Sequence, residues 1–494
     1  MAQQPTPTIR VTTRLVNVNV IVREKGKLVT GLTAGDFQVF DNGKPQKIAF
    51  FAMTGQEQRS EPTTKREPNV FSNRDTPSGE NPTSATVLLL DGLNTRFSDQ
   101  AYARQHIRNF LREVNPDDKI AIYVLGRRLK VLNDFTDDRD HLARVLARYR
   151  GENTTQVDPL DDSDIFGDEG LIDASVAKER EFSDRNRSRT TMAVFNAVAK
   201  HLARLPGRKS VIWVSSSFPI FLYDVERNLK PEVDQVTRWF SNANIAIYPV
   251  DARGLVGAST YATASVRFPE QRERSAANME TLRILAAQTG GVAYYNTNDI
   301  GGAMRQAASD TQFTYTLGYY PEPGKPDGKF HTIKVKVNGK GADVRHRKGY
   351  YATEEASPEG DLRDAAVRDA IWSPLEASEI ELSVRADPVQ GGLDLGIRVN
   401  PETITIERKL DHRVGEIRAV ITQLDARGKV LESKSHALNM DLTEDSYRSV
   451  QKDWLLIRQR LQTSPEAFMV RVIVQDLANG ALGSVNIPLS KLGR

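Results

Sequence analysis

The sequence predicts a multidomain protein, in which a doubly wound, Rossmann-type α/β domain is inserted in a small β domain and followed by a C-terminal β-sandwich. Three observations support this prediction. The chain has 494 residues, which is too long for one ordinary core. Its middle part alternates apolar strands with amphipathic helices. Both ends carry strand patterns of period two, which are typical of antiparallel sheets with one buried face.

The N-terminal β unit is predicted for residues 1–52. Val16, Val18 and Val20 alternate with polar or oppositely directed residues, as in a half-buried strand. The triplet Asp41-Asn42-Gly43 is typical of a hairpin turn. Alternating strands return in residues 322–352, but they are too few for a sheet of their own. We therefore expect 322–352 to pair with 1–52 and complete the N-terminal unit.

Three segments are poor in apolar residues. Residues 53–84 are rich in Gln, Glu, Ser, Thr, Pro and Asn and predict a flexible linker. Residues 151–188 begin with many acidic side chains and predict a long loop, which is typical of functional or disordered segments. Residues 353–375 predict a linker with a short helix.

The α/β domain is predicted for residues 85–321. Buried strands are expected at 86–91, 120–125, 210–215, 245–250 and 292–295, with helices between them. A last helix near 300–311 leads to an apolar and aromatic segment at 313–320, which we assign to the same domain. Strands that alternate with helices predict a mainly parallel sheet with helices on both faces.

The C-terminal β-sandwich is predicted for residues 376–494, which carry further alternating strands. Segments 380–386, 393–399, 417–424 and 468–476 show the pattern most clearly. The apolar segment 454–461 fits either a helix or a strand, and the pattern leaves both open.

Composition excludes several classes of function. The 67 basic and 64 acidic residues leave a net charge of only +3, which argues against a dedicated nucleic-acid-binding protein. The absence of cysteine excludes disulfides, thiol catalysis and zinc–thiolate sites. No apolar run reaches transmembrane length. The polar start resembles that of an exported protein without its signal peptide, and a cytoplasmic protein is the alternative.

Motifs for catalysis are scarce. The sequence has no phosphate-binding loop, no dinucleotide fingerprint, no paired-histidine zinc spacing and no Gly-x-Ser-x-Gly elbow. We therefore expect a protein that is not an enzyme. A hydrolase that uses the acidic loop is the least favoured alternative, because no spacing suggests a pair of catalytic carboxylates.

Seven segments resemble, in order, the von Willebrand factor type A-related proteins of the acidobacterial type. They are residues 20–23, 29–37, 41–43, 90–95, 206–215, 315–321 and 344–351. The resemblance covers residues 9–352. It implies a von Willebrand factor A-like α/β domain and an exported or surface-associated protein that binds other proteins. It identifies no ligand.

This resemblance also implies a candidate metal site at the end of strand 86–91. The metal-ion-dependent adhesion site of the family has the pattern Asp-x-Ser-x-Ser, and this chain has Asp91-Gly92-Leu93-Asn94-Thr95. Asp91 and Thr95 match ligands, whereas Leu93 cannot ligate a cation. We therefore expect a degenerate site that holds Mg²⁺, or Mn²⁺ or Ca²⁺, weakly if at all.

Further ligands are expected from two other loops. Thr190 is the favoured second-loop ligand and Thr191 its alternative, Asn94 could add an oxygen, and Ser216 stands where the family has an Asp. Without a cation, Asp91 would accept hydrogen bonds from Thr95, Thr190 and the serines and would hold the loops together.

The segment after Ser216 is apolar and aromatic. Phe218, Phe221 and Tyr223 fall in a predicted loop at the same edge, where aromatic side chains are typical of an interface hot spot. Packing of this loop back on the domain is the alternative. We therefore expect a protein-binding or adhesion-type module with an unidentified protein ligand. A structural or assembly protein of the cell envelope that self-associates through its β domains is the second hypothesis.

Overall fold

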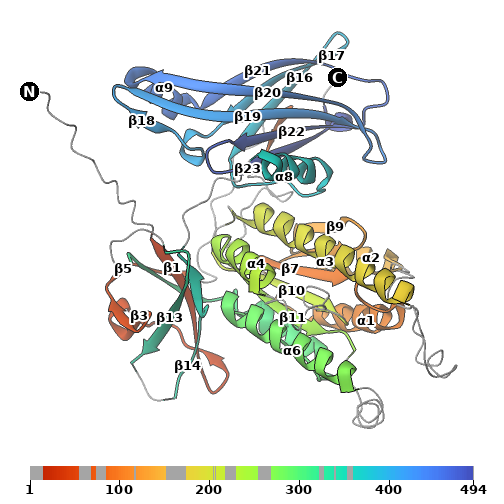
Figure 1. The fold of residues 1–494 in the computed structure, drawn as a ribbon, viewed down its shortest axis with the longest axis vertical. Helices are drawn as coiled ribbons and strands as arrows, with labels where there is room; N and C mark the ends of the chain where they lie inside the picture. Colours follow the sequence, from red (N-terminus) through yellow and green to blue (C-terminus); the bar gives the residue numbers. More distant parts are fainter. Residues whose placement is uncertain are drawn as a thin grey trace, which may run out of the picture.

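The computed structural model describes most of the chain and divides it into three groups of sheets (Figure 1). The described residues are 15–54, 68–73, 85–115, 118–151, 174–203, 205, 207–216, 230–253, 269–321, 327–338, 341–352 and 360–492. The aromatic residues Phe218, Phe221 and Tyr223 lie outside them, as does most of the acidic segment, residues 152–173.

The α/β domain is built on the sheet β11-β10-β7-β8-β9. The first four strands are parallel and β9 is antiparallel at the edge. The strands are β7 (Ala85–Asp91), β8 (Lys119–Leu125), β9 (Leu129–Thr136), β10 (Lys209–Ser215) and β11 (Ile245–Asp251). Strands β7, β10 and β11 are buried along their whole length, which explains their continuous apolar sequences.

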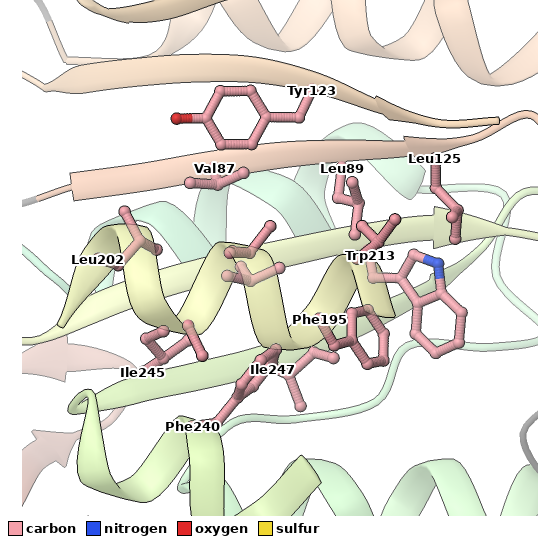
Figure 2. Close-up of a cluster of buried hydrophobic side chains, with 14 of the residues drawn as sticks. Val87, Leu89, Tyr123, Leu125, Phe195, Leu202, Trp213, Phe240, Ile245 and Ile247 are labelled. Atoms are coloured by element: carbon pink, nitrogen blue, oxygen red, sulfur yellow. The ribbon is translucent and has the colours of Figure 1, made fainter. Parts of the chain in front are cut away.

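Helices cover both faces of this sheet. Helices α1 (Phe97–Glu113), α2 (Arg139–Arg148) and α7 (Ile300–Ser309) pack on one face. On the other face lie α3 (Ala174–Leu202), α4 (Lys230–Asn242) and α6 (Pro269–Thr289). Figure 2 shows the core of this second face, where the rings of Phe195 and Trp213 meet edge to face with centroids 4.9 Å apart. Helix α3 begins at Ala174, so the loop predicted to extend to residue 188 is wrong for its last part.

The β domain has two sheets, whose strands come from the segments before and after the α/β domain in the sequence. One has the order β14-β1-β12-β5, with β2 also on β1, and the other has the order β15-β13-β3-β4. The strands are β1 (Val16–Glu24), β2 (Lys27–Leu28), β3 (Phe37–Asp41), β4 (Lys44–Gln46), β5 (Ile48–Thr54), β12 (Thr314–Tyr319), β13 (Phe330–Val337), β14 (Asp343–Arg345) and β15 (Gly349–Tyr351). The turn between β3 and β4 places Asn42 and Gly43 at φ 46° and 82°, the left-handed conformation that this hairpin requires.

Strand β12 corrects a prediction, because the segment 313–320 was assigned to the α/β domain. It pairs with β1 and β5 instead. Its alternating residues Tyr315, Leu317 and Tyr319 are buried in the core of the β domain. The two antiparallel neighbours of β12 identify it as a strand of the β domain and not of the parallel sheet. The predicted strand at 292–295 forms only an isolated bridge between Tyr294 and Val250.

The C-terminal domain has two sheets that share one core. Their orders are β21-β17-β16-β6 and β18-β19-β22-β23, with β20 on β19. The strands are β6 (Val70–Ser72), β16 (Leu382–Val389), β17 (Gly392–Val399), β18 (Glu407–Lys409), β19 (His412–Leu424), β20 (Val430–Thr443), β21 (Leu455–Gln462), β22 (Met469–Asp476) and β23 (Leu482–Pro488). Helices α8 (Gly360–Trp372) and α9 (Glu444–Asp453) complete the domain. The segment that fitted either a helix or a strand is therefore strand β21.

Strand β6 corrects the prediction that 53–84 is only a linker. It pairs with β16, more than three hundred residues further along the chain. The side chain of Asn73 holds it there: its Nδ2 donates to the carbonyls of Ala377 (2.8 Å) and Ile380 (2.7 Å), and its Oδ1 accepts from the amide of Leu382 (2.9 Å). A three-residue strand makes few ladder hydrogen bonds, so this side-chain clamp supplies the missing ones.

A buried ion cluster joins the β domain to the α/β domain. Asp310, at the end of α7, is fully buried and accepts hydrogen bonds from Arg23 on β1 (2.8 Å), Arg345 on β14 (2.8 and 3.2 Å) and Tyr248 on β11 (2.8 Å). Two cationic side chains of one domain therefore share a single carboxylate of the other. We call this group the Asp310 cluster.

Candidate functional site

The carboxyl ends of three parallel strands bring polar side chains together at one edge of the α/β sheet. Strands β7, β10 and β11 end at Asp91, Ser215 and Asp251, and the register places Ser215 beside Asp251. Each polar residue follows an apolar strand, so the strand is buried while its last side chain reaches the loop layer. Ligand sites of open α/β sheets lie at this edge.

Asp91 is buried and surrounded by hydrogen-bond donors of its own chain. Its Oδ1 accepts from the backbone amide of Asn94 (2.8 Å), and its Oδ2 accepts from Asn94 Nδ2 (2.9 Å) and from the indole Nε1 of Trp213 (3.0 Å). Burial raises the pKa of Asp91 to about 6, against the opposing effect of these donors and of Ser215. The N–H and O–H groups of the chain therefore offset the cost of burying this carboxylate only in part.

Thr95 and Ser216 join the first loop of the edge to the third. The amide of Ser216 donates to Thr95 Oγ1 (3.1 Å), and the amide of Arg96 donates to Ser216 Oγ (3.3 Å). Thr95 Oγ1 also lies 3.5 Å from Ser215 Oγ. These hydroxyls, which the family resemblance assigns to metal ligation, here bridge two loops.

The second expected ligand position lies within helix α3, which contributes Thr191 and not Thr190. Thr191 is buried, accepts a hydrogen bond from Asn94 Nδ2 (3.2 Å) and donates to the carbonyl of Arg187 (2.9 Å). Thr190, one residue earlier, points elsewhere on the helix and donates to the carbonyl of Asn186 (3.0 Å). Successive helix residues are 100° apart, so only one of the two can face Asp91.

Leu93 explains why one expected hydroxyl is missing. Its side chain is only 3% exposed and belongs to the same buried cluster as Phe195 and Trp213. A serine at this position would lose that packing. The loop therefore contributes apolar contact at the position where an adhesion site contributes an oxygen ligand.

The donor set around Asp91 is suited to a bare carboxylate more than to a cation. Mg²⁺ requires about six oxygen ligands, most of them with lone pairs directed at the ion. Asp91 instead faces N–H groups of Asn94 and Trp213, whose partial positive charges would repel a cation. Asn94 Oδ1 is buried without a hydrogen-bond partner, because its amide is turned with the nitrogen toward Asp91. Within the described residues, no group of three or more His, Asp or Glu side chains could hold a metal ion.

A second carboxylate at this edge was missed by sequence reasoning. Asp251 is the last residue of β11 and is 4% exposed. Its carboxylate accepts three hydrogen bonds from Arg253: from the backbone amide (3.0 Å), from Nε (3.0 Å) and from Nη2 (2.8 Å). An apolar strand that ends in Asp-x-Arg was the available signal. The guanidinium holds this carboxylate within the loop, so it presents no free charge to a partner.

Among the described residues, the edge exposes cationic and aromatic side chains. Arg96 and Phe97 are exposed where α1 begins, and Phe97 is 48% exposed. Arg127 and Arg128 are exposed in the turn after β8, and the Arg128 guanidinium lies 5.2 Å from the ring centroid of Trp372. In the described part of this edge, Asp91 and Asp251 are therefore buried, whereas Arg96, Arg127 and Arg128 are exposed.

Comparison with solved structures finds several matches, one of which is described as a von Willebrand factor type A protein. A BatB protein from Bacteroides thetaiotaomicron is 13% identical and covers 46% of this chain and 98% of its own, with a TM-score of 0.26. A von Willebrand factor type A protein from Catenulispora acidiphila is 9% identical, covers 64% and 82%, and has a TM-score of 0.26. The pilus adhesin SpaC from Lactobacillus rhamnosus GG is 7% identical, covers 92% and 57%, and has a TM-score of 0.29.

No family model and no curated protein matches the chain. The acidobacterial resemblance stays a prediction. None of the described helices combines the length and the apolar character that crossing a bilayer requires.

Proposed function

We propose that the chain is an exported, non-enzymatic binding module that receives an acidic protein partner at the carboxyl edge of its α/β sheet without a metal ion. One observation carries the proposal: Asp91 and Asp251 are both buried and hydrogen-bonded within the chain, while Arg96 and Arg127 are exposed at the same edge.

The exposed arginines, and not the buried carboxylates, determine what this edge can bind. In the adhesion-type sites that the sequence resembles, a bound cation accepts a carboxylate of the partner. Here an arginine guanidinium is the available cation, and it binds carboxylates through paired, charge-assisted hydrogen bonds. Asp91 then has a positioning role, because its hydrogen bonds hold Asn94 and the loop that carries Arg96.

The probe for this function is a fluorescent glutamate-rich peptide, with binding measured by anisotropy. We expect the variant R96Q/R127Q to bind about 10-fold or more weakly, because each charge-assisted hydrogen bond contributes about 1.5–3 kcal/mol. The variant R108Q/R112Q is the matched control, since both arginines are exposed on α1 away from the edge. Equal loss in both variants would show non-specific attraction and contradict the proposal.

A titration with Mg²⁺, Mn²⁺ and Ca²⁺ separates the metal-free version from the metal version. We expect no binding heat, and we expect peptide binding to be unchanged by EDTA. Heat that disappears in Asp91→Ala would restore the metal site, with Asp91, Thr95 and Thr191 as its ligands.

Assembly through the β domains is the second candidate function, and strand β20 favours it. This 14-residue strand pairs with β19, and within the described residues its other side has no strand partner. An edge of this length can accept a strand of another molecule. Strand β1 is already paired with β12 through Val16–Val20 and with β14 through Ile21–Arg23. Light scattering over a concentration series tests assembly, and a strict monomer would contradict it.

A further inference from the structure

The outer face of the sheet β21-β17-β16-β6 forms a groove lined by arginines. Alternate residues of β17 face the core, such as Leu395 and Ile397, and the residues between them face outward, such as Gly396 and Arg398. In Figure 1, β16, β17 and β21 lie on the side of the C-terminal domain away from the α/β domain. Two adjoining hollows of about 820 and 490 Å³ lie over this face and share Ser383, Arg398 and Leu456. We call them the outer groove.

The strand register places three arginines around a glycine. Gly396 pairs with Arg385 on one side and with Arg458 on the other, and Arg398 is two residues along the same strand. These three arginines are exposed. Neighbouring strands are about 4.8 Å apart, and alternate residues of one strand are about 7 Å apart. Gly396 has no side chain, so the centre of the arginine triangle is open to an incoming group.

The charges of the groove fit an anionic ligand that also carries hydroxyl groups. Five cationic side chains line the two hollows: Arg385, Arg398, Lys452, Arg458 and Arg460. Three carboxylates accompany them: Asp387, Asp394 and Asp453. The cations exceed the carboxylates by two, which favours an anion. The carboxylates can accept hydrogen bonds from the hydroxyl groups of such a ligand.

Trp454 lies at one end of the groove, and its backbone has an uncommon conformation. Trp454 lines the smaller hollow together with Arg398 and Lys452. Its φ is 64°, in the left-handed region that bulky side chains rarely adopt. Such outliers persist where the surrounding structure requires them and are concentrated at functional sites. A flat aromatic surface beside cations suits a sugar ring, whose C–H groups pack on the indole while its acidic group meets an arginine.

From these observations we propose that the outer groove binds a linear anionic polysaccharide that bears uronate or sulfate groups. Arg385, Arg398 and Arg458 receive its acidic groups by charge-assisted hydrogen bonds, and Trp454 packs against a sugar ring. The groove belongs to a different domain from the Asp91 edge, so this site is independent of the function proposed above.

The test uses the full chain and three probes of similar length: an alginate oligosaccharide, a dextran sulfate oligosaccharide and neutral dextran. We expect binding to the two anionic glycans and none to dextran. The variant R398Q/R458Q should bind at least about 10-fold more weakly, because it loses two charge-assisted contacts. The variant R408Q/R427Q removes two exposed arginines that do not line the groove and should bind as the wild type does.

Gly396→Leu separates a shaped groove from simple charge attraction. A Cβ at this position would meet only Leu456 Cδ1 at 3.8 Å and Arg385 Cβ at 4.0 Å, which are ordinary contacts, so the fold should tolerate the change. The leucine side chain would fill the floor while every charge remains. We expect at least a 10-fold loss of glycan binding with unchanged circular dichroism.

Three outcomes would overturn the proposal. One is glycan binding that R398Q/R458Q leaves unchanged, a result that stands whether or not Gly396→Leu folds. Another is unchanged binding in a folded Gly396→Leu variant. The third is equally tight binding of a polyglutamate peptide or an oligothymidylate, weakened to the same extent by R398Q/R458Q. That result would identify an acidic protein segment or a nucleic acid as the ligand.

Discussion

Removing the carboxylate of Asp310 tests how firmly the β domain is held to the α/β domain. The substitution is Asp310→Ala. It leaves Arg23 and Arg345, whose side chains are only 10% and 15% exposed, without their shared counterion. The Tyr248 hydroxyl also loses its acceptor. Two cations would then remain close together in a region that water reaches poorly.

The size of the effect follows from burial. The Asp310 side chain is 0% exposed, and both of its oxygens accept charged donors at 2.8 Å. Breaking a buried ion pair by removing one partner costs about 3–5 kcal/mol, because the remaining charge is uncompensated. Glu280→Ala is the control: Glu280 and Arg283 form a pair whose side chains are 52% and 63% exposed, and such pairs contribute about 0–1 kcal/mol.

Urea unfolding followed by tryptophan fluorescence measures the difference in free energy of unfolding. A loss below about 1 kcal/mol in Asp310→Ala would refute the reasoning, since it would equal that of the exposed pair. A third variant, R23M/D310L/R345M, replaces the ions by apolar side chains of similar size. We expect it to recover most of the loss, because the desolvation penalty of all three charges disappears with them.

Three further changes have defined outcomes. Burial lowers the pKa of Lys209 to about 7. Above pH 7 only the unfolded chain still binds the proton, so the free energy of unfolding of the wild type should rise by up to about 1.4 kcal/mol per pH unit. Lys209→Met should be more stable than the wild type at pH 7, and thermal unfolding at pH 7 and 9 should show this advantage shrinking. Trp213→Phe removes a hydrogen-bond donor to Asp91 and should lower the free energy of unfolding by about 1.5–3 kcal/mol. The loss should be larger at pH 8 than at pH 5, because Asp91 is protonated in the folded state at low pH. An equal loss at both pH values would contradict this. Asn73→Ala removes the clamp on β6 and should speed amide hydrogen exchange in β6 and β16 at least about 10-fold, whereas unchanged exchange would show that the ladder alone holds the strand.

Strand β7 shows what the sequence could predict. Its apolar run followed by Asp91 indicated a buried parallel strand, and the structure has that strand at Ala85–Asp91. The partner of Asp91 could not be predicted in the same way. Trp213 pairs with Leu89 in the sheet, and its side chain extends past that pair to reach the carboxylate. An apolar strand pattern counts tryptophan as core and gives no sign of where its N–H points.

Strands β12 and β6 show where periodicity fails. The segment of β12 follows a helix of the α/β domain directly, so its position in the chain suggested the wrong sheet. Residues 70–72 are too few for a period to appear, and their partner strand β16 lies more than three hundred residues further along the chain. In both cases the pairing partner is distant in sequence, and no local pattern encodes a distant partner.

The position of β6 has a consequence for synthesis of the chain on the ribosome. Phe71 pairs with Val384, so this strand emerges 313 residues before the strand that it joins. At roughly 5–20 residues per second, it waits for tens of seconds while the whole α/β domain is translated. The last domain can therefore close only by recruiting a segment that was made first. Truncation after residue 375 would leave the three-residue strand without its sheet, whereas expression of 376–494 alone would leave that sheet with an uncovered edge.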